Sequence, residues 1–306
     1  MKISPKAALH RGFTILELMV AMAITAIIVG VLVTITGTAI DTWNNSRNEL
    51  RAARQAEAMI NIMTRDLESL VVRSDRPQEW LSTILETPTD GGSTNAARMI
   101  FFTAATDRYD GQIGVQGQDL GGDISCVGYR LDWKDPVAPS DDDSTQESPK
   151  FETFVLNRHI VNPDQTFQNL LGATDDANTL DSVYTAAYGG LMDQDRNFVC
   201  ENIFQFTMVF HVDVVDAGGN VVTEMVSVSP SGNGKTSLRV QHNAIKTLPA
   251  EANLENGVLT AVEISLTVLT DTAIAQLRGN NALAENSDWV SANSYSFSRL
   301  VQVPRK

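Results

Sequence analysis

An uninterrupted run of apolar residues near the start of the chain is the clearest feature of its hydropathy pattern. Between residues 18 and 40 no side chain is charged. At about 1.5 Å per residue in a helix, this run is long enough to cross the roughly 30 Å hydrocarbon core of a bilayer. The pattern therefore predicts one membrane-spanning helix over residues 13–40.

From Asp41 onward the hydropathy pattern becomes amphipathic. As far as about residue 72, apolar residues recur at spacings of three, four or seven, and charged residues, among them Arg65, Asp66 and Glu68, occupy the other face. This periodicity predicts an amphipathic continuation of the helix over residues 41–75, ended by Pro77. The charged face is expected to meet water, and the apolar face to pack on a sheet of the same chain, on neighbouring chains, or on both along different parts of the helix.

Beyond residue 76 the chain contains short runs typical of β-strands. Residues 216–220 read DAGGN between two such runs, which predicts a hairpin. Residues 134–150, 161–195 and 229–235 are predicted loops, and residues 273–286 a short surface helix. The predicted strands lie at 98–103, 125–133, 152–157, 204–215, 221–228, 259–269 and 296–303. This order predicts an α+β fold in which a long N-terminal helix packs on a mainly antiparallel β-sheet.

The first twelve residues are basic and too short to fold, which indicates a leader peptide. They contain Lys2, Lys6 and Arg11 and no acidic residue, so the N-terminus is predicted to be cytoplasmic and the body to lie across the membrane. An ordinary secretory signal would have a shorter apolar core, and no Ala-x-Ala site ends the apolar run here before the charged helix begins at Asp41. The predicted divisions are a leader (1–12), an apolar helix (13–40), an amphipathic helix (41–75) and an extracytoplasmic β-rich domain (76–306).

One acidic residue, Glu17, stands at the edge of the apolar run. A charged side chain at the centre of a membrane helix costs about 2.5–3.5 kcal/mol on insertion scales. A role as a simple membrane anchor therefore does not explain why Glu17 is present. Its predicted place in the first helical turn is where the helix dipole favours an anion. Cleavage after Gly12 would also give Phe13 a positively charged amine with which Glu17 could pair, within one chain or between neighbours.

The sequence GFTILELMV, residues 12–20, resembles the class III signal of type IV prepilins and type II secretion pseudopilins. The resemblance implies cleavage between Gly12 and Phe13 by a prepilin peptidase, N-methylation of Phe13, and a role for Glu17 in filament assembly. It further implies a non-enzymatic, single-pass inner-membrane protein with a periplasmic body that enters a filament. Its implied partners are other pilins or pseudopilins, an inner-membrane assembly platform and membrane lipid.

The body resembles J-type minor pseudopilins through short motifs around Tyr129, Leu156–Arg158, Ala261–Ile264 and Arg299. It is also similar to long prepilin-like cassette proteins of planctomycetes and verrucomicrobia. These resemblances imply a minor subunit of a type IV pilus-like or type II secretion filament. A membrane-anchored periplasmic enzyme and an adhesin or DNA-uptake minor pilin are the alternatives.

The charge of the chain bears on its partners. The 306 residues carry a formal net charge of −14, and because the leader holds three cations, its removal leaves −17. So acidic a body repels phosphate, which argues against a nucleic-acid partner. No Gly-rich phosphate loop and no Gly-x-Ser-x-Gly elbow occurs, so no catalytic residues and no cofactor are predicted.

Cysteines and acidic loops leave two questions open. Cys126 and Cys200 are either buried thiols or, outside the cytoplasm, the partners of one disulfide. Asp193, Asp195 and Asn197 open with the spacing of an EF-hand, but the later glycine and glutamate positions hold phenylalanine, so that interpretation fails. No metal ligands are assigned, and loosely bound calcium in the acidic loops is the alternative to a solvated surface.

Overall fold

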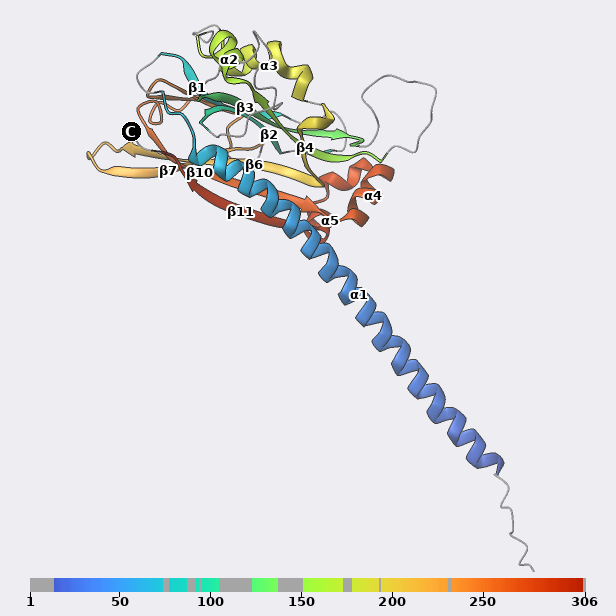
Figure 1. The fold of residues 1–306 in the computed structure, drawn as a ribbon. Helices are drawn as coiled ribbons and strands as arrows, with labels where there is room; N and C mark the ends of the chain where they lie inside the picture. The colour runs from blue at the N-terminus through green and yellow to red at the C-terminus, as the bar shows by residue number, and fades with distance from the viewer. Residues whose placement is uncertain are drawn as a thin grey trace, which may run out of the picture. The chain divides into compact units, whose positions relative to one another are not determined.

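The computed structural model describes residues 14–73, 77–86, 92–93, 95–104, 123–136, 151–172, 178–192, 194–230 and 233–304 (Figure 1). The chain divides into two compact units, residues 1–50 and residues 51–306. The first unit contains the apolar part of the N-terminal helix. The second contains the rest of that helix together with the whole β-sheet.

The predicted apolar and amphipathic segments form one helix, α1 (Ile15–Glu68). It continues without interruption through Gly30 and Gly37. It ends at Glu68, before the predicted end at residue 75. The helix ends there because the next residues pair with the backbone of β2. Leu70 forms a β-bridge with Thr103, and the Val71 N–H donates to the Phe102 carbonyl at 2.9 Å.

The described residues form an eleven-stranded, mainly antiparallel sheet, as predicted. The strand order is β11-β10-β6-β2-β1-β8-β9, with β3, β4 and β5 continuing from β2 and with β7 paired to β6. Among the strands that the structure describes, β2 and β6 pair in parallel, at Ala96 and Phe206. The strands are β1 (Glu79–Glu86), β2 (Ala96–Thr103), β3 (Ser125–Lys134), β4 (Thr153–Val161), β5 (Phe198–Glu201), β6 (Ile203–Val215), β7 (Val221–Val228), β8 (Ser237–Gln241), β9 (Ala244–Leu248), β10 (Val258–Leu269) and β11 (Ser294–Gln302).

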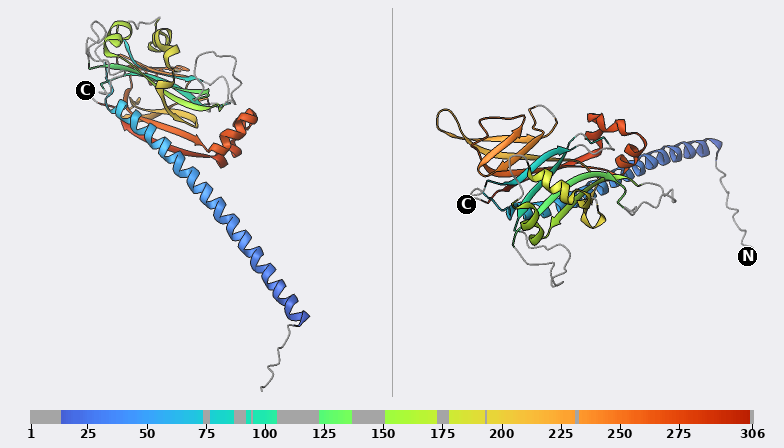
Figure 2. Two further views of the ribbon diagram at one scale, coloured as in Figure 1. Left: turned by 45° about the vertical axis from the view of Figure 1, so that its right-hand side comes forward. Right: turned by 90° about the horizontal axis from the view of Figure 1, so that it is seen from above.

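Short helices join these strands (Figure 2). They are α2 (Pro163–Gln165), η1 (Thr166–Leu170), α3 (Leu180–Met192), η2 (Asp195–Asn197), α4 (Asp271–Gly279), η3 (Asn281–Glu285) and α5 (Ser287–Asn293). The predicted loop over residues 161–195 is therefore wrong where α2, η1 and α3 lie. In α3 the buried residues Leu180, Tyr184, Tyr188 and Met192 recur every four positions, which gives the helix an apolar face despite its polar surroundings.

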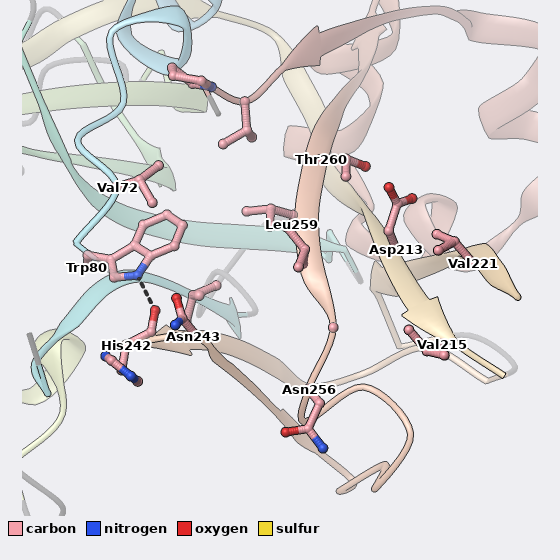
Figure 3. A pocket seen from close by; sticks show the side chains of 15 residues that line it. Val72, Trp80, Asp213, Val215, Val221, His242, Asn243, Asn256, Leu259 and Thr260 are labelled. Carbon is pink, nitrogen blue, oxygen red and sulfur yellow. Dashed lines mark hydrogen bonds between the residues drawn. The ribbon is translucent and has the colours of Figure 1, made fainter. Parts of the chain in front are cut away.

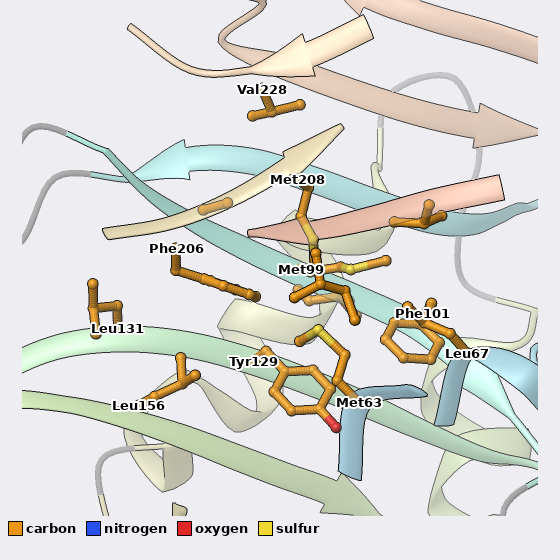
Figure 4. Close-up of a cluster of buried hydrophobic side chains, with 14 of the residues drawn as sticks. Met63, Leu67, Met99, Phe101, Tyr129, Leu131, Leu156, Phe206, Met208 and Val228 are labelled. Atoms are coloured by element: carbon orange, nitrogen blue, oxygen red, sulfur yellow. The ribbon is translucent and has the colours of Figure 1, made fainter. Parts of the chain in front are cut away.

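The amphipathic part of α1 packs on the sheet of its own chain. Met59, Met63 and Leu67 are fully buried in the same core cluster as residues of β2, β3 and β6 (Figure 4). Burying a side chain of this size contributes about 1.5–3 kcal/mol. The first of the sequence alternatives for this face, packing on the chain's own sheet, is thus confirmed for residues 52–67.

Candidate functional site at the start of the N-terminal helix

The first turn of α1 is closed by a reciprocal pair, Thr14 and Glu17. The Glu17 carboxylate accepts hydrogen bonds from the Thr14 N–H at 2.9 Å and from its hydroxyl at 3.1 Å. The Thr14 hydroxyl oxygen in turn accepts from the Glu17 N–H at 3.2 Å. This arrangement is a capping box, in which two side chains satisfy backbone donors that the helix start leaves free.

The predicted position of Glu17 is confirmed, because the residue lies in the first turn of α1. Its capping role was not predicted, although Thr-x-x-Glu before an apolar run is the sequence signature of a capping box. Gly12 and Phe13 lie outside the described residues. The capping threonine directly follows Phe13 in sequence, so the carboxylate is fixed next to the predicted cleavage point.

Threonine hydroxyls within the apolar run find acceptors on the same helix. Thr25 donates to the Ala21 carbonyl at 2.8 Å, and Thr36 donates to the Leu32 carbonyl at 2.8 Å. Thr34 donates to the Gly30 carbonyl at 3.1 Å. Because these hydroxyls are satisfied internally, they do not add an unpaired polar group to the apolar surface.

One segment near the N-terminus matches a known family model. The model described as the prokaryotic N-terminal methylation motif matches residues 8–33. The chain carries a prepilin-type methylation motif. With the long apolar helix that follows, it fits a prepilin-like protein. No curated protein and no solved structure gives a significant match to the chain.

α1 is long and apolar enough to cross a membrane, and it lies near the N-terminus. The apolar side chains of residues 15–40 are exposed within the chain, including Ile15, Leu16 and Ile27. Such a surface is compatible with a lipid environment, as in a membrane anchor.

A second constellation fixes the other end of α1 to the sheet. Asp66 has no exposed surface, and Arg158 of β4 holds it through two hydrogen bonds of 2.7 Å each. The Tyr129 hydroxyl of β3 donates to the same carboxylate. Burial, and then the nearby Asp66 charge, raise the pKa of Tyr129 well above its usual value, so the phenol remains a donor.

The sequence prediction for Asp66 was wrong, because the charged face of the amphipathic helix was expected to meet water. Asp66 follows Met59 by seven positions and Met63 by three, which places it on the buried stripe of α1. This spacing was the available signal. The buried carboxylate is tolerated because a guanidinium and a phenol satisfy it.

The two cysteines are free thiols, and both are buried. Cys126 lies opposite Val161 of β4, whereas Cys200 lies opposite Leu156 of the same strand from the other side. Five residues of strand separate these positions by about 16 Å, far beyond the roughly 7 Å over which two Cα atoms can be bridged. The disulfide alternative is therefore wrong in this fold. Burial raises the pKa of Cys200 to about 12.

A buried histidine lies between β4 and α3. His159 is 3% exposed, and its Nδ1 lies 2.7 Å from the Tyr184 hydroxyl. Gly128 on the neighbouring strand makes room for this contact, because a Cβ there would lie 2.5 Å from the same hydroxyl oxygen. Burial, with a smaller effect of Arg196, lowers the pKa of His159 to about 4.

Because His159 is buried in its neutral form, we expect the stability of the β-rich domain to fall at acidic pH. The folded pKa of about 4 lies below the usual 6.5, so neutral His159 contributes stability above pH 6.5. That contribution is lost as the pH falls from 6.5 toward 4. Between pH 7 and pH 5 we expect the free energy of unfolding to drop by about 1–2 kcal/mol from this group. Urea unfolding at both pH values measures this change in the free energy of unfolding.

Two variants test whether His159 is its source. His159→Gln should remove most of the decrease in stability between pH 7 and pH 5, whereas His242→Gln, at an exposed site, should not. An equal decrease in the original chain and in both variants would contradict the assignment of the effect to His159.

The described part of the body also contains a half-open cavity of about 620 Å³ (Figure 3). Its lining is mostly apolar and includes Trp80, Leu259 and Val303. The Trp80 indole N–H donates to the His242 carbonyl at 3.0 Å, and the Thr223 hydroxyl donates to the one lining carboxylate, Asp213, at 2.6 Å. His242 and Thr260 also line the cavity, and the Thr260 hydroxyl donates to the His211 carbonyl at 3.0 Å.

No cluster of three or more metal-ligating His, Cys, Asp or Glu side chains occurs among the residues that the structure describes. Much of the predicted acidic loop, residues 137–150, and Asp193 lie outside the described residues. The expectation of loosely bound calcium is therefore not tested there.

Proposed function

We propose that this chain is a structural subunit, a minor pilin or pseudopilin, of a type IV pilus-like or type II secretion filament. The observation that carries the proposal is the coincidence of the matched methylation motif with an acid fixed in the first turn of a long apolar helix. The basic leader before that helix supports a cytoplasmic N-terminus, a single inner-membrane span and a periplasmic body.

In this proposal, prepilin peptidase cuts between Gly12 and Phe13 and methylates the new N-terminus. The amine of Phe13 then begins the chain one residue before the capping threonine. Glu17 gains a cationic partner in addition to Thr14, which offsets the cost of an acid at the edge of an apolar environment. The apolar helices of neighbouring subunits bundle, and the acid of one pairs with the amine of its own chain or of the next.

The proposed partners are the peptidase, other pilins or pseudopilins, an inner-membrane assembly platform and membrane lipid. The more specific J-type assignment has weaker support. Two of its short motifs contribute Tyr129 and Arg158, which meet around Asp66 and hold α1 on the sheet. Their presence is explained by packing, so they support the architecture more than a particular position in a filament.

Replacement of Gly12 tests the processing step. We expect Gly12→Val to leave the full-length precursor, because a β-branched side chain next to the scissile bond resists the close approach that glycine allows. Intact-mass measurement of the membrane-extracted protein should then show residues 1–306 without a methyl group. A matched control, Ser4→Ala, lies in the leader but outside the matched motif and should be cleaved normally. Normal cleavage of Gly12→Val would refute the proposed site.

A further inference from the structure

Strand β7 leaves one of its edges open. It pairs with β6 through a continuous register, from Met208 opposite Val228 to Val215 opposite Val221. At the opposite edge of β7, Lys235 pairs with the C-terminal end of the strand. The Lys235 N–H donates to the Ser227 carbonyl at 2.8 Å, and the Lys235 carbonyl accepts from the Ser229 N–H at 3.1 Å.

These two bonds fix which backbone groups point outward. Because Ser227 directs its carbonyl away from β6, alternation places the backbone groups of Met225, Thr223 and Val221 on the same outer side. Within the described part of the chain β7 pairs with no strand other than β6. Five residues of β7, 221–225, therefore present an edge with unpaired strand donors and acceptors.

The side chains along this edge are exposed and apolar. The exposed fractions are 68% for Val221, 72% for Met225 and 70% for Val215, which lies opposite Val221 on β6. Protein edges are usually protected by lysine, proline, a bulge or a covering segment. β7 contains neither lysine nor proline, and its register has no bulge. Such an edge favours addition of a further strand.

The hairpin is also uniformly acidic. Residues 203–228 contain Asp213, Asp216 and Glu224 and no lysine or arginine. Neutral donors contact two of these carboxylates: the Thr223 hydroxyl binds Asp213 at 2.6 Å, and the Asn253 amide binds Glu224 at 2.9 Å. Hydrogen bonds from Asn220 lower the pKa of the exposed Asp216, which keeps it charged.

We propose that the outer edge of β7 binds an extended segment of a different protein in which apolar and basic residues alternate. The added strand pairs with the backbone of residues 221–225, packs apolar side chains beside Val221 and Met225, and places cations on the opposite face, toward Glu224. A second copy of this chain is the poorer occupant, because it would bring the same carboxylates to the edge. An interface this short is small, so the binding is weak without further contacts.

A defined peptide tests this directly. The probe is a soluble nine-residue peptide that alternates valine and lysine, added to the full chain in non-ionic detergent, with a valine–glutamate peptide as its matched control. Hydrogen exchange should show that the lysine peptide slows the outward amides of Thr223 and Met225 at least about tenfold. The inward amides of Val222 and Glu224, already paired with β6, should change little. The glutamate peptide should have no effect.

Variants separate edge pairing from general attraction between opposite charges. Met225→Pro removes an outward N–H without changing the charge and should weaken peptide binding at least tenfold, measured by fluorescence anisotropy. Val258→Thr, at another exposed apolar position, should bind as the original chain does. Unchanged binding by Met225→Pro, or unchanged exchange at Thr223 and Met225 in the original chain, would overturn the proposal. Spontaneous cross-linking of Thr223→Cys chains to each other would also overturn it, in favour of a second copy.

Discussion

Glu17→Gln should be cleaved normally yet join neighbouring subunits at least about tenfold less than the original chain. Glutamine can occupy the third helical position of a capping box, so the bonds with Thr14 are retained in kind. What glutamine removes is the negative charge that would pair with the Phe13 amine. An unpaired buried cation costs several kcal/mol, and each 1.4 kcal/mol corresponds to a factor of ten.

Cross-linking to co-expressed pilin-like subunits, followed by quantification of the adducts, measures this loss. Glu17→Asp keeps the charge on a shorter side chain and should retain part of the assembly. If Glu17→Gln assembles normally while Glu17→Ala does not, the acid serves only to cap the helix, and the proposed charge pairing is wrong.

Asp66→Ala should destabilise the body by about 3–5 kcal/mol. The substitution leaves the Arg158 guanidinium in a largely buried position without the carboxylate that now accepts two of its hydrogen bonds at 2.7 Å. It also removes the acceptor of the buried Tyr129 hydroxyl. Breaking a buried ion pair by deleting one partner costs this much because the other charge remains desolvated.

Denaturant unfolding of the purified chain, followed by tryptophan fluorescence, reports this effect. Glu68→Ala is the matched control: it removes an exposed carboxylate from the same helical turn and should cost less than about 0.5 kcal/mol. A small effect of Asp66→Ala, similar to that of Glu68→Ala, would show that the buried pair does not hold α1 to the sheet.

The sequence predicted the long helix, the α+β class and seven of the strands because each has a strong local pattern, but it missed the eight-residue β1. In β6, buried and partly exposed residues alternate from Phe204 to Val214, which is the period of a strand with one face in the core. The DAGGN turn then fixed the hairpin with β7. These elements depend little on the rest of the chain.

The strands and helices that were missed depend on tertiary contacts. The four-residue β5 is too short to show a period, and it forms because it pairs with β4. β8 and β9 are each five residues long, and their pairing with β1 and with each other defines them. For α3, residues such as Asp181 and Gly189 weakened the helical signal, and the buried tyrosines supplied the decisive packing.

The candidate site shows the same division. The position of Glu17 followed from its distance to Gly12 and from the apolar run. Its capping partner Thr14 was equally visible in the sequence and was overlooked. By contrast, the partners of Asp66 come from β3 and β4, more than 60 and 90 residues away, and no local pattern identifies them.

The intact mass and N-terminal sequence of the chain extracted from its native membrane test the central claim most directly. The account predicts a protein of residues 13–306 that begins with a singly methylated Phe13 and retains the entire apolar helix. A protein that still begins at Met1, or one cut after the apolar helix, would contradict it.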